Sequence, residues 1–266
     1  MKLVNKNEHV NPLSNLIKHG GYTAIFRTMA VIGDSLASGE HVGFDGKVVT
    51  HNDYYEYSWG QFIARKCGTH VYNFSCGGLT AKEYENYANM TKSYMAEKAC
   101  QAYIIALGRN DMNQWDKYEY GFGSMDDVDF DNPENNRDSF VGHYVKIIQK
   151  YRQIQPKSRI FVMTMPVSSN DKGEKDEKCD KHAEFLRKLP EYFEFLYVID
   201  LRKYAPIHDE DFVSIYYCDS HLNAMGYLLT AEQVCTYIDY IIRNNPKDFN
   251  QVAFIGKNVH NINEKW

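Results

Sequence analysis

The stretch Met29-Ala30-Val31-Ile32-Gly33-Asp34-Ser35-Leu36 joins an apolar run to a turn that carries a serine. The run up to Ile32 is rich in residues that favour strands, and Gly33 ends it with a residue that permits a sharp turn. In an open α/β sheet, ligands bind at the carboxyl ends of the strands. We therefore expect Ser35 at a binding edge, where its hydroxyl is well placed to act as a nucleophile.

Four further apolar runs follow the first, and helical patterns separate them. The five expected strands cover roughly residues 26–32, 70–74, 102–107, 159–165 and 196–201. Ser58 is expected to cap a helix that runs to Lys66. Thr80 and Glu83 form a capping box that opens a longer helix, to about Ala99. This alternation predicts an α/β fold: a three-layer α/β/α sandwich with a doubly wound, parallel sheet of about five strands.

Two connections are too long for ordinary turns. The first runs from Gly33 to about Tyr57 and carries two histidines, His41 and His51, besides several aromatic residues. The second is polar and runs from Gly108 to about Asp138. Because loops of more than about 15 residues are usually functional, we expect the first to be a binding loop or lid.

The overall composition is that of an ordinary globular protein. We expect one domain over residues 1–266, with its core at about 25–245, a polar arm before it and a polar tail after it. The net charge of −5 gives no reason to propose nucleic acid as a partner, and no stretch is apolar enough to span a membrane. Scattered cysteines and the lack of a visible signal peptide favour reduced thiols and a cytoplasmic location. The oligomeric state is left open.

Four polar segments fall on the same side of the expected sheet. They are Gly33-Asp34-Ser35, Gly77-Gly78, Gly108-Arg109-Asn110-Asp111 and Cys218-Asp219-Ser220-His221. A serine nucleophile needs a base, because its hydroxyl is protonated at neutral pH, and His221 is the candidate. Acyl transfer also needs donors for the oxyanion. The candidates are a backbone N–H of the glycine turn, the Ser35 N–H and the side-chain amide of Asn110.

These segments resemble the conserved blocks of the GDSL esterases, also called SGNH hydrolases. When Asn73 and Thr80 are matched to the ends of the second block, its oxyanion glycine falls on Gly78. The resemblance spans residues 32 to 223 in the family's order. It implies a serine esterase with Ser35 as nucleophile and His221 as base. Gly78, Asn110 and the Ser35 N–H would hold the oxyanion, and no cofactor or metal would be needed.

The sequence departs from the family at one position. The family usually has an aspartate three residues before the histidine, where this chain has Cys218, and an aspartate follows one place later as Asp219. Asp219 is the favoured third member of a triad. Two alternatives stay open: another carboxylate or a backbone carbonyl holds the imidazole, or Ser35 and His221 work as a dyad. The third group orients the ring, so its loss usually slows catalysis without abolishing it.

Two patterns invite a metal site but do not predict one. Cys179 with His182 and Cys218 with His221 form Cys-x-x-His pairs, whereas structural zinc more often uses Cys-x₂₋₄-Cys units. The alternating aspartates at 127–131 resemble the start of a calcium loop, but the position that requires glycine is Asn132. We therefore expect no zinc at the two pairs and read the aspartates as a solvated acidic loop.

The resemblance implies substrates from acetylated sugars to lipids, aryl esters and thioesters. The first long connection is rich in His and Tyr, and no apolar lid stands out. This favours O-deacetylation of an acetylated carbohydrate, with a small-molecule or oligosaccharide ester as the partner. The alternatives are a short-chain acyl or lysophospholipid esterase, a thioesterase, or a carbohydrate-binding domain that is catalytically weak because the aspartate is missing.

Overall fold

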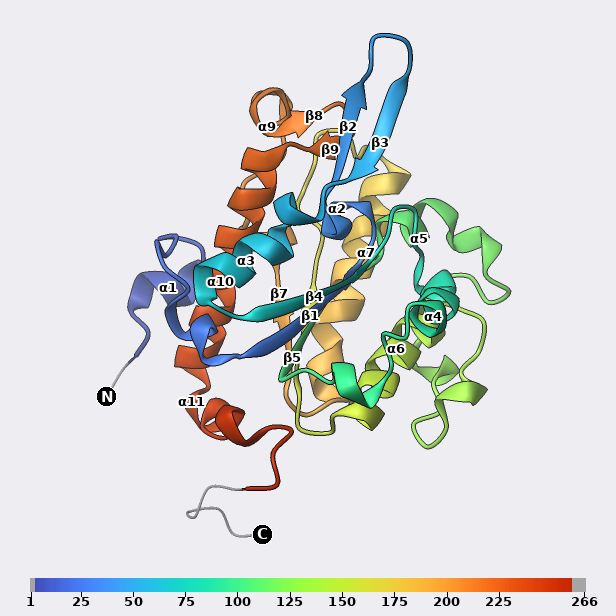
Figure 1. The fold of residues 1–266 in the computed structure, drawn as a ribbon. Helices are drawn as coiled ribbons and strands as arrows, with labels where there is room; N and C mark the ends of the chain where they lie inside the picture. The colour runs from blue at the N-terminus through green and yellow to red at the C-terminus, as the bar shows by residue number, and fades with distance from the viewer. Residues whose placement is uncertain (1–2, 260–266) are drawn as a thin grey trace.

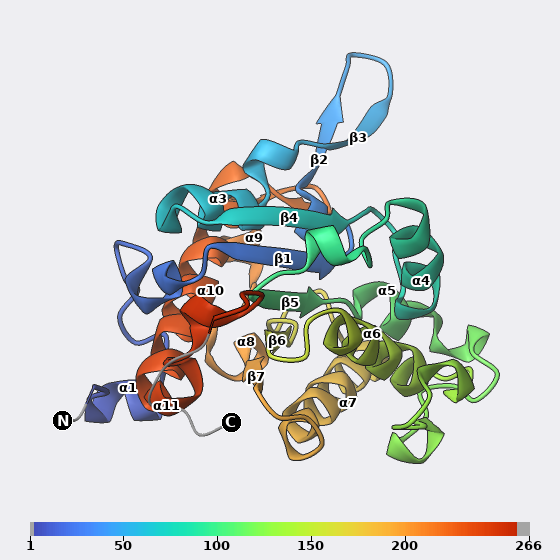
Figure 2. The same cartoon turned by 60° about the horizontal axis from the view of Figure 1, so that its bottom comes forward.

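A computed structural model describes residues 3–259 and contains a five-stranded parallel sheet in the order β4-β1-β5-β6-β7 (Figures 1 and 2). The strands are β1 (Thr28–Gly33), β4 (His70–Ser75), β5 (Ala102–Ala106), β6 (Arg159–Met163) and β7 (Leu196–Ile199). Every pair in this sheet is parallel. The predicted fold class is therefore confirmed. The strand order reverses at β1, so the carboxyl end of β1 lies at the switch point where open α/β sheets bind ligands.

Helices cover both faces of the sheet (Figure 2). On one face lie α3 (Trp59–Cys67) and α10 (Ala224–Asn244), and on the other lie α4 (Ala81–Met90), α6 (Phe140–Ile154) and α7 (Glu174–Lys188). Strand β1 shows why both faces need cover. Val31 packs with the first layer and Ile32 with the second, and both are buried. A strand buried on both faces reads as a continuous apolar run.

Two of the predicted helix starts are confirmed, and one predicted helix end is wrong. The Ser58 side chain accepts from the Gln61 N–H, and Thr80 forms the capping box that opens α4. However, α4 ends at Met90 instead of near Ala99. Lys92 has a φ of 57°, which is left-handed backbone and cannot continue a right-handed helix.

The connection after β1 is not a loop, which corrects the prediction. It contains α2 (Ser35–Ser38), the hairpin strands β2 (Glu40–Phe44) and β3 (Val49–Asp53), and the 3₁₀ turn η2 (Tyr55–Tyr57). Gly39 ends α2 in a left-handed conformation with φ 89°, so the chain turns directly into β2. The hairpin β2–β3 projects beyond the carboxyl edge of the sheet, next to β8 and β9 (Figure 1).

Short elements complete the described chain. They are α1 (Lys6–Val10), η1 (Gly21–Ile25), η3 (Ala96–Lys98), α5 (Arg109–Gln114), η4 (Trp115–Lys117), η5 (Met125–Asp127), η6 (Pro133–Asn135), η7 (Leu189–Glu191), α8 (Leu201–Tyr204), α9 (Glu210–Tyr216), β8 (Tyr217–Cys218), β9 (His221–Leu222), α11 (Pro246–Phe249) and η8 (Val252–Phe254). The second predicted loop therefore holds α5 and three 3₁₀ turns. Within the described chain, every helix is too short or too polar to span a bilayer.

The N-terminal segment lies along α10. The Tyr22 N–H donates to Asp239 at 2.7 Å, and Arg243 binds Glu8 at 2.6 Å. Residues 1–2 of the predicted arm and 260–266 of the predicted tail lie outside the described residues.

Candidate active site

The turn after β1 presents Ser35 at the carboxyl edge of the sheet. Gly33 is required there, because a Cβ at this position would lie 2.4 Å from the Ala37 Cβ. Asp34 is the N-cap of α2, and its carboxylate accepts from the Leu36 N–H at 3.1 Å. Burial raises the pKa of Asp34 to about 7. Asp34 therefore shapes the turn, and Ser35 is left half-buried as the first residue of α2.

Ser35 and His221 meet although 186 positions separate them in the chain. The His221 Nε2 lies 2.9 Å from the Ser35 Oγ. His221 is carried by β9 of the small β8–β9 hairpin, and Asn223 then caps α10 by accepting from two backbone N–H groups. Burial, above all, lowers the pKa of His221, although the charge of Glu40 opposes this. The imidazole is therefore kept in the neutral form that a general base requires.

The structure does not bring Asp219 to the imidazole. Asp219 is exposed and occupies the turn of the β8–β9 hairpin with φ 56°. It has no hydrogen bond to His221 among the described residues, and it acts on that ring only through its charge. The group at the His221 Nδ1 is the Ser220 Oγ, at 3.0 Å. This hydroxyl can accept a hydrogen bond from the Nδ1–H and so favour the tautomer that leaves Nε2 unprotonated.

The predicted oxyanion donors gather at the same edge. Gly78 is exposed and has φ 79°, a left-handed conformation that glycine adopts without strain. The Asn110 amide donates to the Leu79 carbonyl at 3.1 Å, which links the glycine turn to the segment after β5, where Asn110 lies. The second hydrogen of this amide is left for a ligand. Among residues 3–259, neither the Ser35 N–H nor the Gly78 N–H has a hydrogen-bond partner.

Glu40 is a site residue that the sequence reasoning missed. Its Oε1 lies 3.4 Å from the His221 Nε2 and 2.8 Å from the His51 Nδ1. It also explains Gly77, since a Cβ there would lie 2.5 Å from the Glu40 Oε2 and 4.0 Å from the Ser35 Cβ. The sequence shows a carboxylate five residues after the candidate nucleophile. Only the register of the β2–β3 hairpin shows that this carboxylate faces His221.

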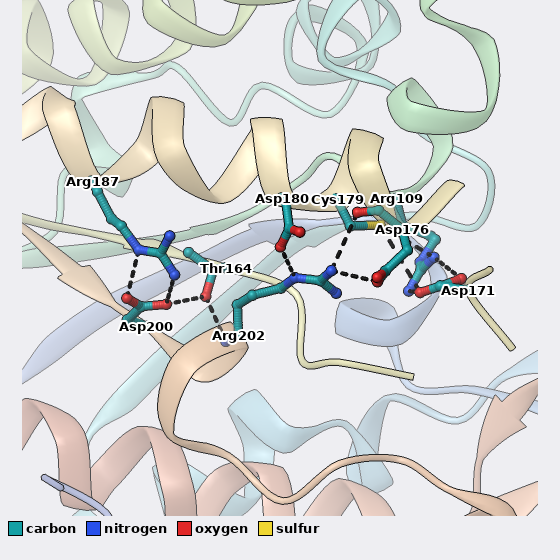
Figure 3. Close-up of polar contacts among 9 residues, drawn as sticks. All are labelled: Arg109, Thr164, Asp171, Asp176, Cys179, Asp180, Arg187, Asp200 and Arg202. Carbon is teal, nitrogen blue, oxygen red and sulfur yellow. Dashed lines mark hydrogen bonds and ion pairs between the residues drawn. The ribbon is translucent and has the colours of Figure 1, made fainter. Parts of the chain in front are cut away.

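A row of ion pairs runs from Arg109, the neighbour of Asn110, to Arg187 and Asp200 (Figure 3). Arg109 binds Asp171 through two hydrogen bonds of 2.9 Å, and the side chain of Asp171 is only 2% exposed. Farther along α7, Arg202 binds Asp176 and Asp180, and Arg187 binds Asp200 (Figure 3). These pairs join α7 to the carboxyl edge of the sheet.

Asp111 is a buried residue that joins the glycine turn to the segment that carries Asn110. This buried carboxylate accepts from the Ala81 N–H at 2.8 Å and from the Tyr118 hydroxyl. Burial raises its pKa to about 6. Asp111 therefore links the start of α4 to α5, which places Asn110 relative to the glycine turn.

The two Cys-x-x-His pairs do not form a common site. The buried His182 faces the Leu107 carbonyl at 3.1 Å, Cys179 packs against Arg109 and Asp171, and His221 faces Ser35.

Comparison with known proteins agrees with this fold. A family model described as the GDSL-like lipase/acylhydrolase family matches residues 31–229. A family two carbohydrate esterase from Clostridium thermocellum, solved in complex with cellohexaose, is similar in structure. It is 16% identical with a TM-score of 0.57, and the match covers 84% of this chain and 65% of that one.

Two other solved structures share the fold. A family 2 carbohydrate esterase from Corynascus thermopiles is 16% identical with a TM-score of 0.56, and the match covers 82% of this chain and 67% of that one. A possible lipase from Chitinophaga pinensis is 17% identical with a TM-score of 0.54, with coverages of 82% and 98%. This chain thus spans about two thirds of the length of the two carbohydrate esterases. No curated protein matches the sequence.

Proposed function

Because the chain belongs to the GDSL-like lipase/acylhydrolase family, we propose that it hydrolyses a carboxylic ester through an acyl-enzyme on Ser35. The observation that carries this proposal is the 2.9 Å contact between the Ser35 Oγ and the His221 Nε2. A hydroxyl within hydrogen-bond reach of a neutral imidazole can lose its proton as it attacks.

The proposed reaction has two acyl transfers. As the Ser35 Oγ bonds to the carbonyl carbon, His221 takes its proton, and the oxyanion is held by the Ser35 N–H, the Gly78 N–H and the Asn110 amide. The imidazolium then protonates the leaving alcohol, and the acyl group stays on Ser35. His221 then takes a proton from water as the water attacks the acyl carbon of this ester. The tetrahedral intermediate breaks its bond to the Ser35 Oγ, His221 returns the proton to that oxygen, and the acid is released.

The imidazolium would be stabilised without an aspartate at Nδ1. The Ser220 hydroxyl lies at that nitrogen, and the nearest carboxylate is Glu40, 3.4 Å from Nε2. Glu40 supplies negative charge next to the imidazole ring while that ring is protonated. We therefore propose a Ser35–His221 dyad supported by Ser220 and Glu40, in place of a triad through Asp219.

A short acyl group and a carbohydrate alcohol are the proposed substrate parts. The connection that follows Ser35 is rich in His and Tyr and not in long aliphatic residues, which favours a short acyl group over a long chain. Three exposed tyrosines, Tyr54, Tyr55 and Tyr57, follow the hairpin, and aromatic rings with polar tips suit sugars. The carbohydrate esterase neighbours favour the same substrate class.

The test compares p-nitrophenyl acetate, butyrate and octanoate, and then acetate release from acetylated xylo- and cello-oligosaccharides. We expect turnover of acetate esters that falls with chain length and disappears in Ser35→Ala. Ser214→Ala, at an exposed serine, should keep wild-type activity and fluorophosphonate labelling. Undiminished turnover by Ser35→Ala would overturn the nucleophile, and faster octanoate hydrolysis would overturn the short acyl group.

A catalytically weak carbohydrate-binding domain is the second candidate. It is favoured because the His221 Nδ1 faces the Ser220 hydroxyl and no carboxylate of residues 3–259. It requires that the wild-type protein bind an unacetylated oligosaccharide in calorimetry while no ester is turned over.

A further inference from the structure

Three donor atoms converge beside the Ser35–His221 pair. They are the Glu40 Oε1, the His51 Nδ1 and the His221 Nε2, and all lie within 4.8 Å of one another. Glu40 is 2.8 Å from His51 and 3.4 Å from His221. Two imidazoles and one carboxylate form a donor set that Zn²⁺ uses when it keeps a fourth position open.

The hairpin register explains why Glu40 and His51 face the same way. His51 pairs with Val42 in the β2–β3 ladder. Because side chains alternate along a strand, Glu40 lies on the same face as Val42 and is the diagonal neighbour of His51. The third ligand comes from β9, and the rings of His51 and His221 lie edge to face with centroids 5.8 Å apart.

The spacing suits a tetrahedral ion. Bonds of about 2.0 to 2.2 Å place neighbouring tetrahedral ligands roughly 3.3 to 3.5 Å apart, and Glu40 and His221 already have this separation. His51 would have to shift slightly away from Glu40. It can do so because its side chain is 52% exposed, whereas those of Glu40 and His221 are only 13% and 15% exposed.

We propose that Glu40, His51 and His221 form a Zn²⁺ site, and that bound Zn²⁺ reversibly inhibits the enzyme. The Nε2 lone pair that would bind the ion is the one that takes the Ser35 proton, since both contacts are made by the same nitrogen. Water or the Ser35 Oγ would complete the coordination. The metal site stands on the three side chains alone, whereas the inhibition rests on the proposed esterase function.

The binding experiment uses the purified protein and Zn²⁺ alone, in isothermal titration calorimetry. We expect one ion per chain, and tetrahedral absorption bands when Co²⁺ replaces Zn²⁺. His51→Gln removes a direct ligand, so affinity should fall by more than the roughly 10- to 100-fold typical of losing an outer-shell partner. His70→Gln, an exposed histidine on β4, is the matched control and should bind like wild type. Equal binding by His51→Gln and wild type would overturn the site.

The activity experiment titrates Zn²⁺ into the p-nitrophenyl acetate assay. We expect inhibition of wild type and His70→Gln that EDTA reverses. The activity of His51→Gln, measured against its own metal-free rate, should no longer respond to Zn²⁺. Binding without inhibition would overturn the regulatory part. If the wild-type protein hydrolyses no ester, the proposed function fails, and calorimetry still decides whether the metal site exists. Matching melting temperatures for the three proteins show that the comparison concerns folded chains.

Discussion

Cys218 lies directly opposite His221 in the antiparallel β8–β9 ladder. It occupies the position, three residues before the histidine, where GDSL esterases usually carry an aspartate. Asp219 and Ser220 form the turn between the two strands, and the left-handed backbone of Asp219 belongs to that turn. The aspartate one position later therefore does not replace the missing one, because it lies in the turn and not opposite His221.

Cys218→Asp should restore the missing carboxylate. Directly opposite residues have Cβ atoms roughly 4.5 to 5.5 Å apart, so a carboxylate there comes within reach of the His221 ring. We expect kcat for p-nitrophenyl acetate to rise about tenfold or more, since a hydrogen bond to a charged group is worth roughly 1.5 to 3 kcal/mol. The pKa of His221 should rise as well. Cys218→Asn has the same shape without the charge, and equal rates for the two variants would contradict the prediction.

Asp219→Asn should change activity little. Asparagine tolerates the left-handed backbone that Asp219 adopts, so the turn is kept while the carboxylate is lost. We expect kcat/KM within about threefold of wild type, against losses of roughly 10³-fold or more for His221→Ala. Steady-state kinetics at pH 8 decide this. A loss comparable to that of His221→Ala would mean that Asp219 orients the ring after all.

Local signals explain which parts of the fold could be predicted. The apolar run of β1 and the caps at Ser58 and Thr80 act within a few residues, and the structure has them where the sequence places them. The end of α4 could not be predicted, because it depends on a left-handed Lys92, a conformation that lysine has no intrinsic preference for.

The site residues likewise fall into those that could be predicted from the sequence and those that could not. Segments with Ser35 and His221 are recognisable because strand ends and a helix cap place them at one edge of the sheet. Glu40 and His51 were not recognisable, since their roles depend on the β2–β3 register. A shift of one residue would turn both side chains to the other face, and the sequence between Gly39 and Tyr57 does not determine that register.

Glu40→Gln should move the acid limb of the pH profile to lower pH. Burial lowers the pKa of His221 and the negative charge of Glu40 raises it, so removing the charge lowers the pKa further. Only the unprotonated Nε2 accepts the Ser35 proton, so the variant stays active at lower pH. The plateau rate should fall several-fold, because the imidazolium loses a stabilising charge. The pH dependence of kcat/KM measures this shift, because it reports the pKa values of the free enzyme. Glu56→Gln, which changes an exposed glutamate, is the control. A shift to higher pH would contradict this account.

Arg109→Met should lower both stability and activity, because Arg109 neighbours Asn110 and holds Asp171. Removing one partner of a buried ion pair costs roughly 3 to 5 kcal/mol. Here Lys175, 3.0 Å from Asp171, should limit the loss in the free energy of unfolding to about 3 kcal/mol or less. We also expect kcat to fall at least about tenfold at a temperature where the variant is fully folded, since a displaced oxyanion donor costs roughly 10²-fold or more.

Arg187→Met provides the matched control for this prediction. It breaks a similar pair with Asp200, whose side chain is 9% exposed, at the opposite end of the row of ion pairs from Arg109 (Figure 3). Urea unfolding should show a comparable destabilisation, while kcat stays near the wild-type value. If both variants lose activity in proportion to their stability, the Arg109–Asp171 pair serves the fold alone. If only Arg109→Met loses kcat, with KM nearly unchanged, the pair positions the oxyanion donor.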